Sequence, residues 1–346
     1  MLKRLSARER YESLIAEFEP ILREIFLAAV ADLRSGIALR VVIERLERQD
    51  IEGAMDALNL DRSAYSPLDE AIARAYSGGG RATVNAMPIL RDPNGAQAVI
   101  RFDAQAYRAV QWLREHSLSE QMVRINKEVA RTVIADGLAR GRGARRIGLD
   151  VAGRINRATG RREGGIIGLS EPQAQHVLSM RERLASGDAD EMAKVFTMKR
   201  RDRRFDRTIQ KAINEGRAVS SEDIDRMAAR YSDRLLQLRA ETIAQDQGMA
   251  AFNAAQIEAY EQAIDRGVVD PATLQKTWRT NLDGRERFTH RQMNKQTVGF
   301  REGFQSPSGA VLKHPHDPDA PAEERIRCRC RMDITIDFLA RFRRHG

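Results

Sequence analysis

The chain has 346 residues, a mass of 39.0 kDa and a formal net charge of +9, with 42% hydrophobic and 31% charged residues. This length predicts about two domains, and the apolar content excludes a disordered chain. Its two cysteines exclude a disulfide framework. Because no stretch has the pattern of a signal peptide or a membrane span, we expect a protein of the cytosol, or one assembled there.

Residues 1–100 predict an N-terminal helical region. Apolar residues from Tyr11 to Leu33 recur at spacings of three and four, as on one face of a helix. Pro20 is expected to start a new helix or to kink this one, and Gly36 to end it.

Three further segments complete this region. Residues 37–58 predict a second helix, and residues 66–80 predict a third that ends at three consecutive glycines. Residues 78–103 contain Gly, Pro and an Asp-Pro-Asn-Gly turn, which indicates a loop with a short strand or hairpin.

Residues 101–264 predict a central helical domain. Ser170 is a suitable N-cap for one of its helices, and residues 231–264 have the amphipathic spacing of one or two long helices. Residues 199–207, KRRDRRFDR, contain six basic and two acidic residues. Such a stretch is typical of a solvated helix face, with phosphate contact as the second interpretation.

Residues 265–346 differ in composition, with many glycines, prolines and turns after Asp270-Pro271. Short strand-like pieces at 276–280, 310–314 and 330–336 predict a small α+β domain. The sequence therefore predicts a mainly α protein, with elongated helical N-terminal and central regions and a small α+β C-terminal domain.

The C-terminal region also carries the side chains best suited to chemistry: Asp283, Arg287, His290, His314, His316, Asp317, Cys328 and Cys330. Zinc takes about four nitrogen or sulfur ligands, which the two thiols and two of the imidazoles could supply. Cys-x-Cys is tighter than the usual zinc spacing. In an extended segment both thiols share one face and the neighbouring arginines the other. The alternative is a pair of small buried residues beneath a strand.

Two catalytic arrangements are weaker hypotheses. Cys330 and His290 could form a nucleophile and base, but the sequence offers neither a group to orient the base nor an oxyanion site. His290, His314 and Asp317 could serve a metal-dependent nuclease, although histidines next to proline and aspartate are common in plain loops. We therefore expect a protein that is not an enzyme.

An ordered series of motifs spans residues 278–330. It consists of Trp278, Asp283, Arg287, Thr289-His290, Gly299, Phe304, Ser306-Pro307, Gly309, Pro315-His316-Asp317, Pro321-Ala322-Glu323-Glu324 and Cys328-Arg329-Cys330. This order resembles the phage Mu protein F-like family of minor head, or head morphogenesis, proteins. Residues 126–177 and 238–256 are similar to the helical region that precedes this tail in such proteins, whereas the resemblance of residues 1–100 is weak.

The resemblance implies a minor capsid protein of a phage or prophage that acts in head morphogenesis. It would be assembled in the host cytoplasm and reside in the virion, inside the capsid or at the portal vertex. Its expected partners are the portal protein, the major capsid protein or both, with non-specific contact to packaged DNA and none to a membrane. The alternatives are a metal-dependent hydrolase or nuclease in the C-terminal domain and a DNA-binding accessory protein.

Two positions depart from the family pattern. Arg327 stands where the family often has Asn, and His316 stands where it often has Gly. Because His316 is therefore not an inherited ligand, the candidate metal set is His290, Cys328 and Cys330, holding a structural zinc. We expect the Cys-Arg-Cys segment to be structural, with its thiols facing inward on a final strand near His290.

Overall fold

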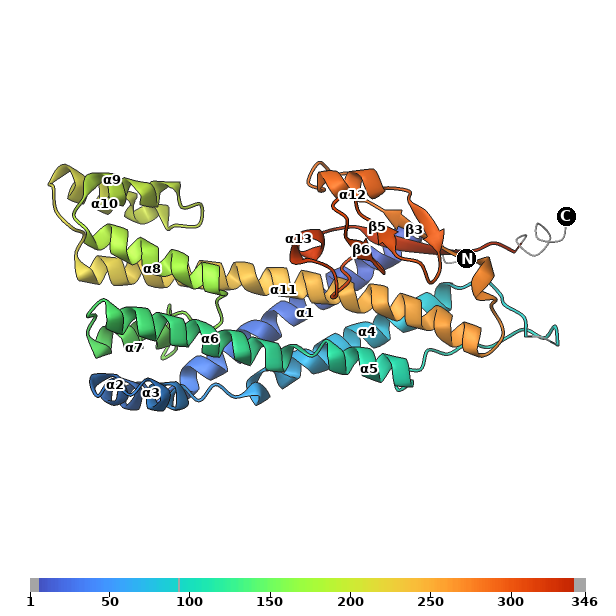
Figure 1. The fold of residues 1–346 in the computed structure, drawn as a ribbon, viewed down its shortest axis with the longest axis horizontal. Helices are drawn as coiled ribbons and strands as arrows, with labels where there is room; N and C mark the ends of the chain where they lie inside the picture. Colours follow the sequence, from blue (N-terminus) through green and yellow to red (C-terminus); the bar gives the residue numbers. More distant parts are fainter. Residues whose placement is uncertain (1–5, 93, 339–346) are drawn as a thin grey trace. The chain divides into compact units, whose positions relative to one another are not determined.

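The computed structural model describes residues 6–92 and 94–338, and it is mainly helical (Figure 1), with 62% helix and 8% strand. This composition confirms the predicted fold class. The α-helices are α1 (Ala7–Gly36), α2 (Leu39–Glu47), α3 (Ile51–Ala57), α4 (Ser66–Ala86), α5 (Tyr107–Glu115), α6 (Leu118–Ala139), α7 (Ala144–Ala152), α8 (Glu171–Ala185), α9 (Ala189–Ala193), α10 (Asp206–Asn214), α11 (Ser221–Asp265), α12 (Phe288–Met293) and α13 (Ala322–Arg325). The strands are β1 (Arg154–Ile155), β2 (Arg162–Glu163), β3 (Leu274–Arg279), β4 (Thr297–Gly299), β5 (Phe304–Gln305), β6 (Val311–Leu312) and β7 (Arg331–Ile336).

The described residues group into two compact units, each built from segments that are far apart in the sequence. The sheet unit comprises the described parts of Met1–Arg23, Leu68–Ser117 and Glu241–Gly346, and the helical unit comprises Glu24–Pro67 and Leu118–Ala240. Helices α1, α4 and α11 contribute residues to both units. The division into 1–100, 101–264 and 265–346 follows chain order and stays a prediction.

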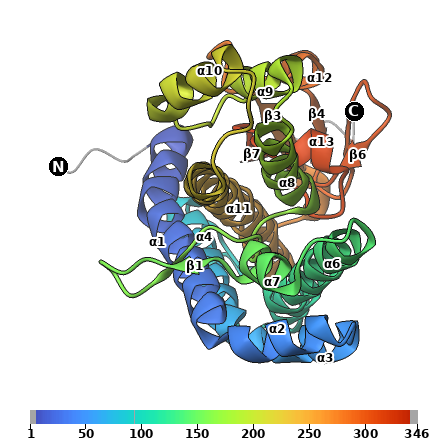
Figure 2. The same ribbon diagram turned by 90° about the vertical axis from the view of Figure 1, so that its left-hand side faces the viewer.

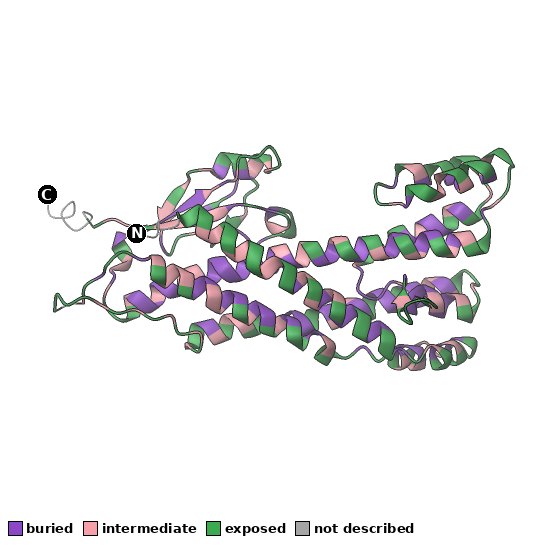
Figure 3. Cartoon of the chain, turned by 180° about the vertical axis from the view of Figure 1, so that it is seen from behind, coloured by how far each residue is buried: buried purple, intermediate pink, exposed green. Residues whose placement is uncertain are grey.

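The long helices have the amphipathic character that their spacing predicted. Figure 3 shows buried positions recurring along them, interleaved with exposed ones. Helix α1 runs without interruption through Pro20 to Gly36, so no new helix starts at the proline. Residues 231–264 belong to a single helix, α11, which is 45 residues long. No helix among the described residues combines the length and the apolar character needed to cross a bilayer.

Residues 37–58 form two helices, so the prediction of one was wrong. Helix α2 ends at Glu47, and Gln49 has a φ of 58°, in the left-handed region that stops an α-helix. The Asp50 side chain then accepts a hydrogen bond from the Gly53 N–H at 2.8 Å and caps α3. The periodicity continues across the break, which is why spacing alone did not reveal it.

The glycine run 78–80 lies inside α4, so the prediction that this helix ends there was also wrong. A Cβ on Gly79 would lie 3.2 Å from the Phe252 backbone, and one on Gly80 would lie 2.4 Å from the Phe102 ring. The glycines are needed here for packing, because only a residue without a side chain lets Phe102 and Phe252 approach the α4 backbone this closely. The following loop has one isolated bridge, between Arg91 and Gln97.

In the helical unit, α2, α3, α6 and α7 lie against one another (Figure 2). Buried polar groups also join its segments. Asn126 donates to the Tyr65 hydroxyl at 2.9 Å and accepts from the Gly168 N–H at 2.9 Å. Helix α8 begins at Ser170 with a capping box that Gln173 completes, which confirms the predicted cap.

The basic stretch 199–207 consists of a turn, a short 3₁₀ helix (Arg203–Phe205) and the first two residues of α10, so most of it is not the solvated helix face that was predicted. Its buried carboxylate, Asp202, organises the local arginines. Arg204 pairs with it at 2.7 Å and Arg234 at 3.5 Å. The hydrogen bonds from Arg204 lower the pKa of Asp202 to about 2.

In the sheet unit, β3 is the central strand of an antiparallel sheet with the order β4-β3-β7, and β5 pairs with β6. Strands β3, β6 and β7 correspond to the three predicted pieces, whereas β4 and β5 were not predicted. Trp278 on β3 is fully buried, with its ring centroid 5.3 Å from that of Phe304 and 5.2 Å from that of His290. The sheet thus places α12 beside its central tryptophan.

Candidate functional site

Three of the predicted site residues come together in the sheet unit. His290 lies on α12, and Cys328 and Cys330 lie in the segment that leads into β7. The His290 Nδ1 atom is 3.3 Å from the Cys328 Sγ and 3.5 Å from the Cys330 Sγ. All three side chains are buried, and their ligand atoms lie within 4.8 Å of one another. Within residues 6–92 and 94–338, no other group of His, Cys, Asp and Glu side chains has this metal-like arrangement.

Strand pairing explains why these residues meet. Strand β7 pairs with β3 along its whole length, with Met332 opposite Trp278. The two cysteines are therefore delivered to the end of β3 where His290 packs. They precede β7 rather than lying on it, which corrects the expected placement on the final strand. The alternation is as predicted, because Arg327 and Arg329 are exposed while both thiols are buried.

His290 is oriented by a buried carboxylate. Its Nε2 atom lies 2.8 Å from Glu324 Oε2, and Glu324 Oε1 accepts a hydrogen bond from the Ser306 hydroxyl at 3.1 Å. Burial works to raise the pKa of Glu324, but hydrogen bonds from Ser308, His290 and Ser306 together lower it. An ionised Glu324 can only accept a hydrogen bond, so Nε2 carries the hydrogen, and in this tautomer of His290 the lone pair is on Nδ1 and faces the thiols.

The two thiols differ in acidity. Burial raises the pKa of Cys328. The hydrogen bond from Cys328 and the neighbouring His290 together outweigh burial and lower the pKa of Cys330 to about 5. The Cys328 sulfur also accepts the Cys330 N–H at 3.2 Å. One sulfur of this pair therefore loses its proton more readily than a free thiol does.

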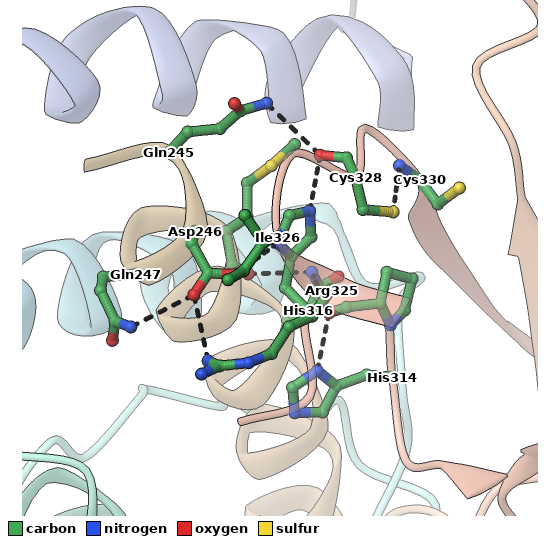
Figure 4. Close-up of polar contacts among 12 residues, drawn as sticks. Gln245, Asp246, Gln247, His314, His316, Arg325, Ile326, Cys328 and Cys330 are labelled. Atoms are coloured by element: carbon green, nitrogen blue, oxygen red, sulfur yellow. Dashed lines mark hydrogen bonds and ion pairs between the residues drawn. The ribbon is translucent and has the colours of Figure 1, made fainter. Parts of the chain in front are cut away.

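His316 has a role that the sequence did not indicate. Figure 4 shows its ring between α11 and the cysteine segment, with Nδ1 3.1 Å from Asp246 Oδ1 and Nε2 2.8 Å from the Cys328 carbonyl. Asp246 also accepts from Arg325 at 3.0 Å, and Gln245 donates to the same carbonyl at 3.3 Å. The histidine thus ties the Cys-Arg-Cys backbone to α11. Its φ of 60° lies in the left-handed region that glycine favours.

The remaining predicted residues do not join the cluster. Asp283 is exposed, and Arg287 donates to the Ile326 carbonyl. His314 contacts the Pro315 carbonyl at 2.9 Å, and Asp317 accepts backbone N–H groups of the adjacent loop. The structure therefore does not assemble the nuclease set of His290, His314 and Asp317.

Sequence reasoning missed several buried groups. Glu324 stood inside the motif series as part of Pro-Ala-Glu-Glu, so a signal existed, whereas Asp246 lies in an ordinary helical stretch that offers none. Lys276 was also missed. It is 2% exposed and donates to the Lys313 carbonyl at 2.8 Å, and burial lowers its pKa to about 8.

The cluster faces a hollow on the surface of the sheet unit. His290, Cys328 and Cys330 line it together with charged residues, among them Asp283, Glu286 and Arg287. The side chains of the cluster have little exposed area, so they form the inner end of this hollow.

These features define a mainly helical protein with a small sheet region that carries a buried cysteine and histidine cluster. Residues 203–333 match the family model described as phage Mu protein F like protein. The resemblance read from the sequence is confirmed over this segment. No curated protein and no solved structure matches the chain.

Proposed function

We propose that this protein is a minor capsid protein of a phage or prophage, acting in head morphogenesis as a structural component and not as an enzyme. The observation that carries this proposal is the family match over residues 203–333. That segment contains α11, the strands β3 and β4, and the whole cysteine and histidine cluster. In this proposal the protein resides in the virion, inside the capsid or at the portal vertex, and docks on the portal protein or the major capsid protein.

The connection between α4 and α5 supports docking on a protein partner. Ile89, Val99 and Tyr107 lie in or next to this connection and are 73%, 74% and 80% exposed. Exposed apolar side chains are unfavourable in water, and burial of these three against a capsid or portal subunit would remove their surfaces from water.

Production of heads with and without this protein tests the proposal. We expect heads made without it to be aberrant or non-infectious, and we expect the protein to be found by mass spectrometry in purified wild-type heads. Co-expression with the portal and major capsid proteins should yield a complex that survives size-exclusion chromatography. Normal, infectious heads made in its absence would contradict the proposal.

We also propose that the basic stretch 199–207 contacts packaged DNA without sequence preference. Lys199, Arg203 and Arg207 are exposed. Among the described residues no ion pair is recorded for these three, whereas Arg204 is occupied by Asp202. Free cations on a protein surface attract phosphates and release counterions, so binding would weaken steeply with salt.

Charge reversal at these three positions tests DNA contact. We expect the triple Glu variant to lose DNA affinity and to show a shallower dependence of binding on salt. The control reverses the exposed residues Arg48, Lys127 and Arg145, which changes the net charge equally. Equal losses in both variants would assign the effect to net charge and refute a local contact.

A further inference from the structure

We propose that His290, Cys328 and Cys330 form a three-ligand centre for Zn²⁺ whose fourth position opens onto the hollow lined by Asp283 and Arg287. This inference does not depend on the proposed role in head morphogenesis. It assigns an exchangeable coordination position, which distinguishes this centre from a closed structural zinc site with four protein ligands.

The distances within the cluster match a tetrahedral metal site. Zinc binds sulfur at about 2.3 Å and imidazole nitrogen at about 2.0–2.1 Å, so a tetrahedron places ligand nitrogen and sulfur about 3.5 Å apart. The two separations between His290 Nδ1 and the sulfurs are 3.3 and 3.5 Å. The chain therefore already holds these atoms near the spacing of bound ligands, and zinc would need little rearrangement.

The surroundings of His290 are those of a metal-binding imidazole. Histidine ligands commonly donate their second ring nitrogen to a carboxylate, which sets the tautomer and makes the first nitrogen a better donor to the metal. Glu324 occupies this position at 2.8 Å, and Ser306 in turn holds Glu324. A plain hydrophobic cluster of cysteines does not require a buried carboxylate behind the imidazole.

The thiols also have the geometry of ligands more than of a disulfide pair. Both are free, and both sulfurs approach the same ring nitrogen, His290 Nδ1, at 3.3 and 3.5 Å. His316 contacts the Cys328 carbonyl at 2.8 Å, which helps to hold the backbone of this cysteine in place. On zinc binding each thiol proton would leave to solvent, and two thiolates would balance the charge of the ion.

A fourth protein ligand is not in place. The cluster contains three candidate ligands, and no further His, Cys, Asp or Glu of the described chain joins it within 4.8 Å. All three line the hollow, so water or a small exogenous donor can reach a metal held there. Three protein ligands with one open position is the arrangement of an exchangeable zinc centre.

Metal analysis of the full-length protein, purified under reducing conditions, tests the ligand set. We expect about one zinc per chain, and the Co²⁺-substituted protein should show sulfur-to-cobalt charge-transfer absorption. Cys328→Ser and Cys330→Ser should each abolish one-to-one binding. His314→Asn is the matched control, because His314 is a buried histidine of the same region outside the cluster, and it should bind zinc normally.

Two further measurements keep the test decisive if a cysteine variant fails to fold. Glu324→Gln should weaken zinc binding about 10- to 100-fold in a chelator competition while the fold, followed by circular dichroism, is retained. Addition of imidazole to the Co²⁺ protein should change its visible d–d bands, because the open position exchanges its water. Wild-type protein without zinc and without the cobalt charge-transfer band would overturn the site. An unchanged spectrum at saturating imidazole would overturn the open position.

Discussion

Substitution of His316 by glycine sets two opposing effects against each other. The residue has a φ of 60°, so glycine would relieve backbone strain. A left-handed conformation costs an ordinary residue about 1–2 kcal/mol, and the greater flexibility of glycine in the unfolded chain removes about 0.5–1 kcal/mol of that gain. The net benefit from the backbone alone is therefore at most about 1.5 kcal/mol.

The lost side-chain contacts outweigh this benefit. His316 is fully buried and contacts the Asp246 carboxylate and the Cys328 carbonyl. A hydrogen bond to a charged group contributes about 1.5–3 kcal/mol and a neutral one about 1 kcal/mol. Glycine removes both contacts, although Arg325 still donates to Asp246 and Gln245 still donates to the Cys328 carbonyl. The missing ring also leaves a cavity. We expect His316→Gly to lower the free energy of unfolding of the sheet unit by about 3 kcal/mol.

Urea unfolding followed by tryptophan fluorescence measures this change, because Trp112 and Trp278 both belong to the sheet unit. Lys295→Gly is the matched control. Lys295 has a φ of 71° and an exposed side chain, so glycine there should stabilise the unit by up to about 1 kcal/mol. A His316→Gly variant as stable as the wild type would refute the idea that this histidine holds the cysteine segment.

Three further predictions concern the fold. Gly80→Ala should destabilise the sheet unit by about 1–3 kcal/mol, because its Cβ would overlap the Phe102 ring. Gly248→Ala should be neutral or stabilising, because the nearest contact of its Cβ is an ordinary 3.4 Å, and chemical denaturation of both variants checks this contrast. The pKa of Lys276 is lowered to about 8, so between pH 8 and 10.5 the unfolded state binds more protons than the folded state. The stability of the wild type relative to Lys276→Met should therefore rise with pH over this window. Parallel curves of stability against pH for the two proteins would contradict this. The pKa of Asp202 is lowered to about 2, so its contribution to stability is present above pH 3.8 and is lost as the pH falls toward 2. In thermal melts, Asp202→Asn should be less stable than the wild type at pH 7, and the difference should vanish near pH 2. Equal stability at pH 7 would argue against the ion pairs.

Local patterns in the sequence were sufficient for much of the helical structure. Helix spacing, the Ser170 cap and the alternation of arginine and cysteine depend on neighbours within a few residues, and the structure has them as predicted. The same holds for the strands β3 and β7, whose apolar and β-branched residues mark them without reference to the rest of the chain. The ordered motif series likewise pointed to the family that residues 203–333 match.

Only the tertiary structure decided what the ambiguous residues do. The glycine run reads as a helix end until Phe102 and Phe252 are brought against it. Spacing along the chain did not rank the imidazoles as partners for the two thiols, and His290 was expected beside them only from the resemblance to the family. Pairing of β7 with β3 carries the thiols to His290, while His316 turns its ring toward Asp246 and the Cys328 carbonyl. These choices depend on contacts between segments tens of residues apart, which no local pattern encodes.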